Sequence, residues 1–242
     1  QFTPAIKIKL DDRLDFSVTS VREIGNQMKK DRTQRDAARG DRRMAISLDA
    51  NASWRTGDIA CAVWKGLCDG VLSQDEDISN WLYMVEQPFP LSYVPGGDPS
   101  EDAAWTRLRH SMHSRGTHPV YLYADESIAT ADDVVLFSNV VDGVNIKLEK
   151  AGGIRAALVA LYTARRLGLR VWIGTMVCTA LGCAQAAQVA LLADDSDVDG
   201  GLLVHPDTFD GGFEWIHETG GIAIPIKSHG FACHRIEPSN QS

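Results

Sequence analysis

Short apolar runs that finish on an acidic residue recur along the chain. The three runs are 46–48 before Asp49, 82–85 before Glu86 and 120–124 before Asp125. Runs of this length are typical of parallel strands that are buried on both faces. A single acid after a strand is often just the first polar residue. Three in chain order favour a shared site, because neighbouring parallel strands end at the same edge of a sheet.

The remaining apolar pattern alternates between strand and helix periods. Further strands are expected at 4–10, 144–148, 170–173 and 197–203, and helices at 20–30, 59–71, 103–112, 131–137, 154–167 and 180–192. The first of these helices would open on a capping box formed by Ser20 and Glu23. Seven strands alternating with helices predict a parallel sheet with helical crossovers. A barrel of this type places its working residues at the carboxyl ends of its strands.

Charged residues also mark the other expected strand ends. Lys7 and Lys9 are two apart, so they face the same side of one strand, and Lys147 and Asp197 fall in two further strand regions. On an exposed edge strand the lysine pair would only be solvated. Inside a barrel the same pair would direct two amines into the cavity.

Composition limits the class of partner. The chain has 242 residues, 44% hydrophobic content and a net charge of −8, with a pI near 5.3. This acidic balance argues against nucleic acid or an anionic membrane as the main partner. The apolar runs are all far shorter than the roughly 20 residues of a membrane-spanning helix. The five cysteines fit no zinc spacing and indicate a cytoplasmic protein with reduced thiols.

The start of the chain is unusual. Residue 1 is Gln1, and a strand-like run begins almost at once. We therefore expect that sequence belonging upstream is missing.

Several motifs, taken in order, resemble the enolase superfamily. They are KIK at 7–9, DAN at 49–51, EQP at 86–88, ADES at 124–127 and NIKLEKAGG at 145–153. The set is most similar to the muconate-lactonizing-enzyme subgroup. Within that subgroup, DVD at 197–199 and the run Gly174–Met176 resemble dipeptide epimerases of the L-Ala-D/L-Glu epimerase type.

The resemblance implies an α/β fold, the enolase-type modified TIM barrel (β/α)7β. Here it would lack the first strand and most of the N-terminal capping domain. Residues 1–204 would form the barrel from its second to its eighth strand, and residues 205–242 would contribute to the capping domain.

The resemblance also implies roles for individual residues. The family removes a proton α to a carboxylate and stabilises the resulting enolate with Mg²⁺. The implied metal ligands are Asp49, Glu86 and Asp125, with Asn51 and Glu126 orienting them. The implied catalytic residues are Lys9 and Lys147, one removing the proton and the other returning it on the opposite face, with Lys7 assisting. The implied substrate-binding residues are Asp197 and Asp199, which suit the α-ammonium of a dipeptide, and Met176.

Three hypotheses follow for the function. The first is an isomerase, a Mg²⁺-dependent dipeptide epimerase that could form a homo-oligomer. The second is a muconate cycloisomerase or o-succinylbenzoate synthase of the same subgroup, whose substrates lack the free ammonium and leave Asp197 and Asp199 without a partner. The third is a truncated, inactive fragment.

Overall fold

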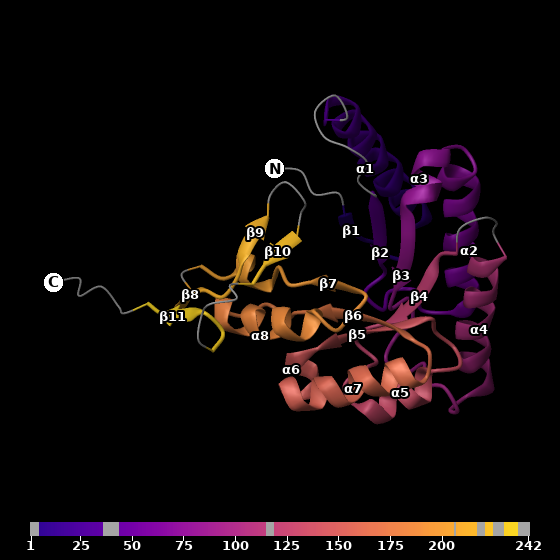
Figure 1. The fold of residues 1–242 in the computed structure, drawn as a ribbon. Helices are drawn as coiled ribbons and strands as arrows, with labels where there is room; N and C mark the ends of the chain where they lie inside the picture. Colours follow the sequence, from indigo (N-terminus) through magenta and orange to yellow (C-terminus); the bar gives the residue numbers. More distant parts are fainter. Residues whose placement is uncertain are drawn as a thin grey trace. The chain divides into compact units, whose positions relative to one another are not determined.

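The chain folds as two compact units. The computed structural model describes residues 5–35, 44–114, 119–205, 207–216, 221–224 and 230–236. The first unit comprises residues 1–127 and 136–142, and the second comprises residues 128–135 and 143–242 (Figure 1). Residues 36–43 and Pro225 lie outside the described residues.

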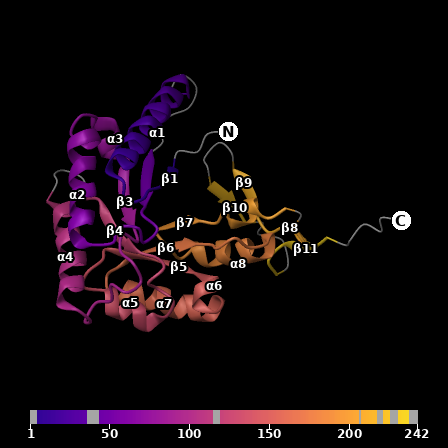
Figure 2. The same cartoon turned by 180° about the vertical axis from the view of Figure 1, so that it is seen from behind.

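The first unit is a parallel sheet covered by helices. Its strands, in spatial order, are β1 (Ala5–Lys9), β2 (Ala45–Asp49), β3 (Leu82–Glu86) and β4 (Tyr121–Ala124). Its helices are α1 (Leu14–Arg35), α2 (Gly57–Leu67) with the π-helical turn η1 (Cys68–Leu72), α3 (Glu76–Trp81) and α4 (Pro99–His113). Figures 1 and 2 show these helices alongside the strands. The order of the elements agrees with the predicted alternation.

Sequence signals account for the helix boundaries in this unit. Thr56 caps α2 by accepting a hydrogen bond from the Ile59 amide at 3.2 Å, and Asp75 caps α3 in the same way through the Ile78 amide at 3.1 Å. Each cap satisfies a backbone donor that the first helical turn leaves open.

Side chains that alternate along the strands supply the core of the first unit. Ile46, Leu48, Val85 and Leu122 are all fully buried. Their burial removes apolar surface from water at about 25 cal/mol per Å². The core therefore holds the strands in place beneath the site described below.

The second unit continues the strand–helix alternation. Its parallel strands are β5 (Gly143–Lys147), β6 (Arg170–Gly174) and β7 (Asp195–Asp197), in that order. Its helices are α6 (Leu148–Ala151), α7 (Ile154–Arg166), α8 (Ala180–Ala190) and the 3₁₀ turn η2 (Gly200–Leu203), and α5 (Ala131–Phe137) contributes residues to both units. Two antiparallel pairs follow, β8 (Phe209–Gly211) with β11 (Cys233–Arg235) and β9 (Glu214–Ile216) with β10 (Gly221–Ala223).

Several boundaries differ from the prediction, most clearly those of α1 and β7. Helix α1 begins at Leu14, so Ser20 lies inside the helix rather than at its cap. The chain turns into the helix before it reaches Ser20, because Asp11 accepts a hydrogen bond from the Arg13 amide at 2.9 Å. Strand β7 ends at Asp197, and residues 200–203 form a 3₁₀ turn instead of a strand. No helix among the described residues is both long and apolar enough to cross a membrane.

Candidate active site

The ends of the first unit's strands bring charged side chains into one row. In the parallel register Lys9 pairs with Asp49, Asp49 with Glu86, and Glu86 with Tyr123. Paired residues in neighbouring strands point to the same face of the sheet. Asp125 follows directly after the last residue of β4. The three acids singled out from the sequence therefore stand at adjacent strand ends.

A shift in register lines up the first two acids. Ile46 pairs with Leu82, but the next residue, Ser47, pairs with Met84, so Tyr83 is skipped. A one-residue slip moves every later side chain of a strand to the other face. Without the shift, Asp49 would pair with Val85. The irregularity at Tyr83 therefore puts the carboxylates of Asp49 and Glu86 on one face.

All three carboxylates are buried, and lysines form ion pairs with Asp49 and Glu86. Asp49 and Asp125 are each 1% exposed, and Glu86 is 0% exposed. Lys7 Nζ lies 2.9 Å from Glu86 Oε2, and Lys9 Nζ forms an ion pair with Asp49 Oδ2. A buried carboxylate needs such a partner, because an unpaired buried charge is strongly destabilising.

The donor set is the kind that Mg²⁺ prefers. Oxygen ligands from carboxylates suit this ion, which demands near-octahedral geometry. Within the described ranges, no group of three or more His, Cys, Asp or Glu side chains is gathered as a metal cluster. Asp49 and Glu86 each contact a lysine instead. The residues therefore fit Mg²⁺ in chemistry and strand position, and binding it requires these two acids to exchange lysine contacts for metal contacts.

Asn51 connects two of the acidic residues. Its amide donates to Asp49 Oδ1 at 2.8 Å, and its side-chain Nδ2 lies 3.4 Å from both Asp49 Oδ2 and Glu126 Oε1. Asn51 has a φ of 45°, a left-handed conformation that asparagine tolerates better than most residues. Asn51 thus contacts Asp49 through both its backbone and its side chain, and the orienting role that the resemblance implies stays a prediction.

Gln87 was not among the sequence-predicted site residues. It follows Glu86 directly, is fully buried, and accepts a hydrogen bond from the Asp125 amide at 2.8 Å. The only available signal was its place between a strand-ending acid and Pro88.

The second unit presents a corresponding row at its strand ends. Lys147 pairs with Gly174, and Gly174 with Asp197. A Cβ built on Gly174 would lie 2.7 Å from Asn145 Oδ1 and 3.1 Å from Lys147 Cε. Gly174 therefore leaves the space in which the Lys147 side chain lies.

Two other predicted residues lie on loops of the second unit. Met176 is 48% exposed, and Asp199 precedes the turn η2. The two loops are joined where the Gly200 amide donates to Thr175 Oγ1 at 3.1 Å. Any side chain at Gly200 would collide with the Met176 carbonyl oxygen, which lies 2.0 Å from an ideal Cβ.

A cysteine pair supports this loop. Cys178 Sγ and Cys183 Sγ lie 3.5 Å apart, on either side of Thr179, which caps α8. Burial is the main cause that raises the pKa of both thiols, which keeps them protonated and poorly reactive at neutral pH. Their positions before the cap and in the first turn are those of a hydrophobic staple.

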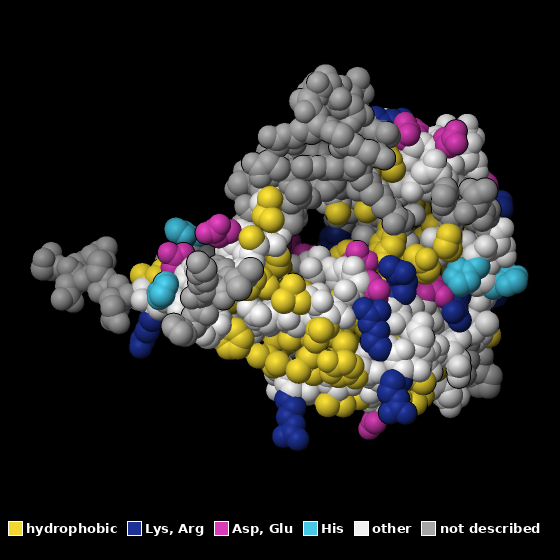
Figure 3. All heavy atoms as spheres, viewed as in Figure 1, with side chains coloured by type: hydrophobic (Ala, Val, Ile, Leu, Met, Phe, Trp, Pro, Cys, Tyr) yellow, Lys and Arg dark blue, Asp and Glu magenta, His cyan; other side chains and the backbone are white. Residues whose placement is uncertain are grey.

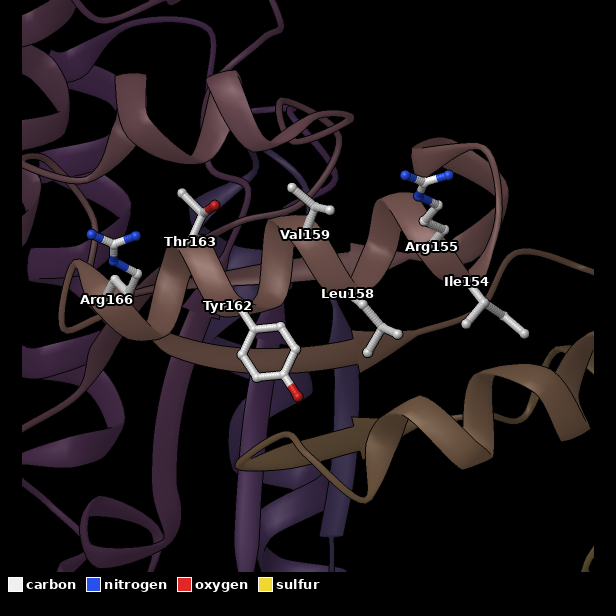
Figure 4. Close-up of a pocket in the computed structure, with 7 residues that line it drawn as sticks. All are labelled: Ile154, Arg155, Leu158, Val159, Tyr162, Thr163 and Arg166. Carbon is white, nitrogen blue, oxygen red and sulfur yellow. The ribbon is translucent and has the colours of Figure 1, made fainter.

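An open apolar hollow lies elsewhere in the second unit. It has a volume of about 610 Å³ and is lined by one helix, α7, including Leu158, Tyr162 and Arg166 (Figure 4). Apolar side chains gather over this part of the surface (Figure 3). The lining contains no carboxylate or lysine, so the hollow lacks the groups that proton transfer or metal binding requires.

Comparison with known proteins identifies relatives of this chain. A family model described as enolase C-terminal domain-like matches residues 2–225. An enolase superfamily member of Dictyostelium discoideum is 32% identical over 216 residues, which are 86% of this chain and 45% of that protein. An L-Ala-D/L-amino acid epimerase of Pedosphaera parvula is 36% identical over 164 residues, which are 68% of this chain and 41% of that protein. The chain thus spans less than half the length of these relatives.

A solved structure shows the same fold. The dipeptide epimerase of Cytophaga hutchinsonii, complexed with Mg and the dipeptide D-Ala-L-Val, matches with a TM-score of 0.70 and 21% identity. The match covers 98% of this chain and 55% of that one. The predicted fold class is therefore confirmed, since the chain has the fold of part of an enolase-type TIM barrel.

Proposed function

This chain belongs to the enolase C-terminal domain-like family, and we propose that it performs the proton-transfer chemistry of a Mg²⁺-dependent dipeptide epimerase. In this proposal residues 1–204 form the catalytic barrel, and residues 205–242 contribute to a capping domain. The relatives named as epimerases support the reaction type. The proposed substrate is a dipeptide of the Ala-Glu type.

The observation that carries the proposal is the row formed by Lys9, Asp49 and Glu86 at three adjacent strand ends. An amine and two buried carboxylates at neighbouring positions place a base next to a cation site. That combination is what removal of a proton α to a carboxylate requires, because the proton is only weakly acidic.

Asp49, Glu86 and Asp125 would hold Mg²⁺. When bound, the ion would supply positive charge that offsets the negative charge developing on the substrate carboxylate. Asn51 would keep Asp49 oriented through its 2.8 Å amide contact, and Glu126 would fix the Asn51 side chain. Such supporting hydrogen bonds commonly tune metal ligands.

Lys9 and Lys147 would act as the two bases. One would take the α-proton and the other would return a proton on the opposite face, which inverts the centre. The 62% exposure of the Lys9 side chain leaves it accessible to a substrate. Lys7, at 16% exposure, would release Glu86 to the metal and contribute positive charge to the site.

Asp197 and Asp199 would bind the substrate's α-ammonium, with Met176 beside them. Two carboxylates suit one ammonium group, because hydrogen bonds between charged groups are stronger than those between neutral groups. A cycloisomerase or o-succinylbenzoate synthase substrate carries no such group, so this pair favours a dipeptide. A cytoplasmic location is part of the proposal and is supported by five cysteines that are all free thiols, as is usual in reducing compartments.

The test is exchange of the substrate's α-hydrogen. The protein is incubated with L-Ala-L-Glu and Mg²⁺ in D₂O, and loss of the α-proton signal is followed by ¹H NMR. We expect exchange with Mg²⁺ and none with a chelator, and we expect Lys147→Ala to form no L-Ala-D-Glu, because one of the two bases is missing. Absence of exchange across a library of dipeptides would contradict the proposal, and epimerisation by Lys147→Ala at the wild-type rate would contradict the two-base assignment.

A further inference from the structure

We propose that Gln87 is a positioning residue that fixes Asp125 relative to Glu86. The inference rests on the proposed function, because it concerns the residues that would hold the metal. Gln87 itself contacts no reacting atom in this proposal. It acts through the backbone of its neighbours.

The backbone of Gln87 joins the ends of three strands. Its amide donates to the Tyr123 carbonyl on β4 at 2.9 Å, and its carbonyl accepts from the Ala52 amide after β2 at 2.7 Å. Gln87 itself follows Glu86 at the end of β3. One residue therefore connects the loops that follow Asp49, Glu86 and Tyr123.

The side chain of Gln87 completes the connection to Asp125. Its Oε1 accepts from the Asp125 amide at 2.8 Å and from the Ser127 amide at 3.3 Å. Its Nε2 donates to Ser127 Oγ and to the Phe89 carbonyl, both at 2.8 Å. Both ends of the carboxamide are thus engaged in a fully buried position. Glutamine is suited to this position because its side chain offers an acceptor and two donors together.

The backbone conformation adds a second reason to single out this residue. Gln87 has a φ of 36°, in the left-handed region that glycine adopts without strain. Residues held in such conformations cluster at functional sites where the surroundings fix them. A glycine here would keep the turn and lose every side-chain contact to Asp125 and Ser127. We call the side-chain hydrogen bonds from Gln87 to Asp125 and Ser127 the Gln87 clamp. Substitution can therefore separate the effect of the turn from the effect of this clamp.

Two variants make this separation. Gln87→Gly keeps the backbone conformation and removes the carboxamide. Gln87→Asn keeps the carboxamide and tolerates the left-handed conformation, but it is one methylene shorter. Gln74→Asn serves as the matched control, because Gln74 is an exposed glutamine whose side chain donates to the Asp69 carbonyl at 3.5 Å, away from the strand ends.

Two measurements test the variants. The first is hydrogen exchange of the Asp125 amide in the metal-free protein, which we expect to accelerate by about tenfold or more in both Gln87 variants, since a buried hydrogen bond is lost. The second is the affinity for Mn²⁺, followed by the EPR signal of the free ion, which we expect to fall by about 10- to 100-fold. Thermal unfolding confirms that each variant remains folded. A purely structural role would lower thermal stability and leave the affinity of the folded protein unchanged.

The outcomes separate the two proposals. If the wild-type protein binds Mn²⁺ and both Gln87 variants bind it equally well, the positioning role of Gln87 is wrong and the metal site stands. If the Asp125 amide exchanges at the wild-type rate in both variants, the clamp itself is wrong. If the wild-type protein binds no Mn²⁺, the proposed metal site fails, and the inference fails with it.

Discussion

Lys7 Nζ reaches across the intervening strand β2 to lie 2.9 Å from Glu86 Oε2. The Glu86 side chain is 0% exposed and the Lys7 side chain is 16% exposed, so this is a largely buried ion pair. Breaking a buried pair by removing one partner leaves an uncompensated charge. A metal bound by Glu86 would supply the same compensation as the ammonium group. Lys7 and the metal are therefore alternative counter-charges for one carboxylate.

The first prediction concerns Lys7→Met. This substitution should destabilise the metal-free protein by about 3 kcal/mol, because Glu86 loses its cation. Saturating Mg²⁺ should then raise the melting temperature of the variant more than that of the wild type, since a ligand that binds only the folded state stabilises it. Differential scanning calorimetry with and without Mg²⁺ measures both effects.

The control for this prediction is Lys65→Met, which removes an exposed lysine paired with Asp69 on the outer surface. Surface pairs contribute about 0–1 kcal/mol, so this variant should respond to Mg²⁺ like the wild type. An equal rise in melting temperature for Lys7→Met and the wild type would show that the metal does not replace Lys7.

The second prediction concerns Gly174→Ala. The added Cβ would lie 3.1 Å from Lys147 Cε and 2.7 Å from Asn145 Oδ1, so the lysine would have to shift. Small displacements of a catalytic group have large effects on rate, and we expect kcat to fall by about tenfold or more. Steady-state kinetics with the dipeptide measures it.

Gly70→Ala is the matched control for Gly174→Ala. Its added Cβ would meet Val18 Cγ1 at 3.0 Å, a comparable crowding away from the strand ends. Retention of the wild-type kcat by both variants would show that Gly174 does not set the position of Lys147.

The third prediction concerns pH and Asp194. Burial alone would raise the pKa of this carboxyl, but the Val171 amide and the Arg165 guanidinium outweigh burial and hold the pKa below the usual 3.8. Their contacts are 2.7 and 2.8 Å long. A carboxylate whose pKa is depressed by folding stabilises the protein above the unfolded pKa. That stability is lost as the pH falls through the folded pKa.

Asp194→Asn should therefore lower the free energy of unfolding by about 1–3 kcal/mol at pH 7. The difference between the variant and the wild type should shrink below about pH 4. Urea unfolding at the two pH values measures it. Asp15→Asn, at an exposed aspartate in the first turn of α1, should change stability by less than about 0.5 kcal/mol at either pH. A difference for Asp194→Asn that stays constant with pH would refute the assigned interaction.

The sequence was sufficient to predict where most strands and helices lie. The alternation of apolar runs placed β3 and α5 at their observed bounds, because each element buries one regular face. It also predicted that Asp49, Glu86 and Asp125 follow neighbouring strands. The start of α1 was missed because the turn at Asp11 and Arg13 is set by a local side-chain contact, whereas Ser20 merely resembles a cap.

Other features of the site depend on contacts between distant segments. The skipped residue Tyr83 belongs to the pairing of two strands, and no periodicity within either strand reports it. The Gln87 clamp joins residues 38 and 40 positions apart. A glutamine that follows an acidic residue can bond to many different partners. Only the folded geometry reveals that the partners of Gln87 are Asp125 and Ser127.

The central claim is that Asp49, Glu86 and Asp125 together bind a divalent ion. Crystals of the protein grown or soaked with Mn²⁺, an ion that accepts the same oxygen ligands, give an anomalous difference map that locates the metal without reference to activity. We predict one strong peak bounded by oxygens of all three carboxylates, and its loss in Asp125→Asn. A map with no peak among these side chains, or with the metal bound elsewhere, would contradict the account.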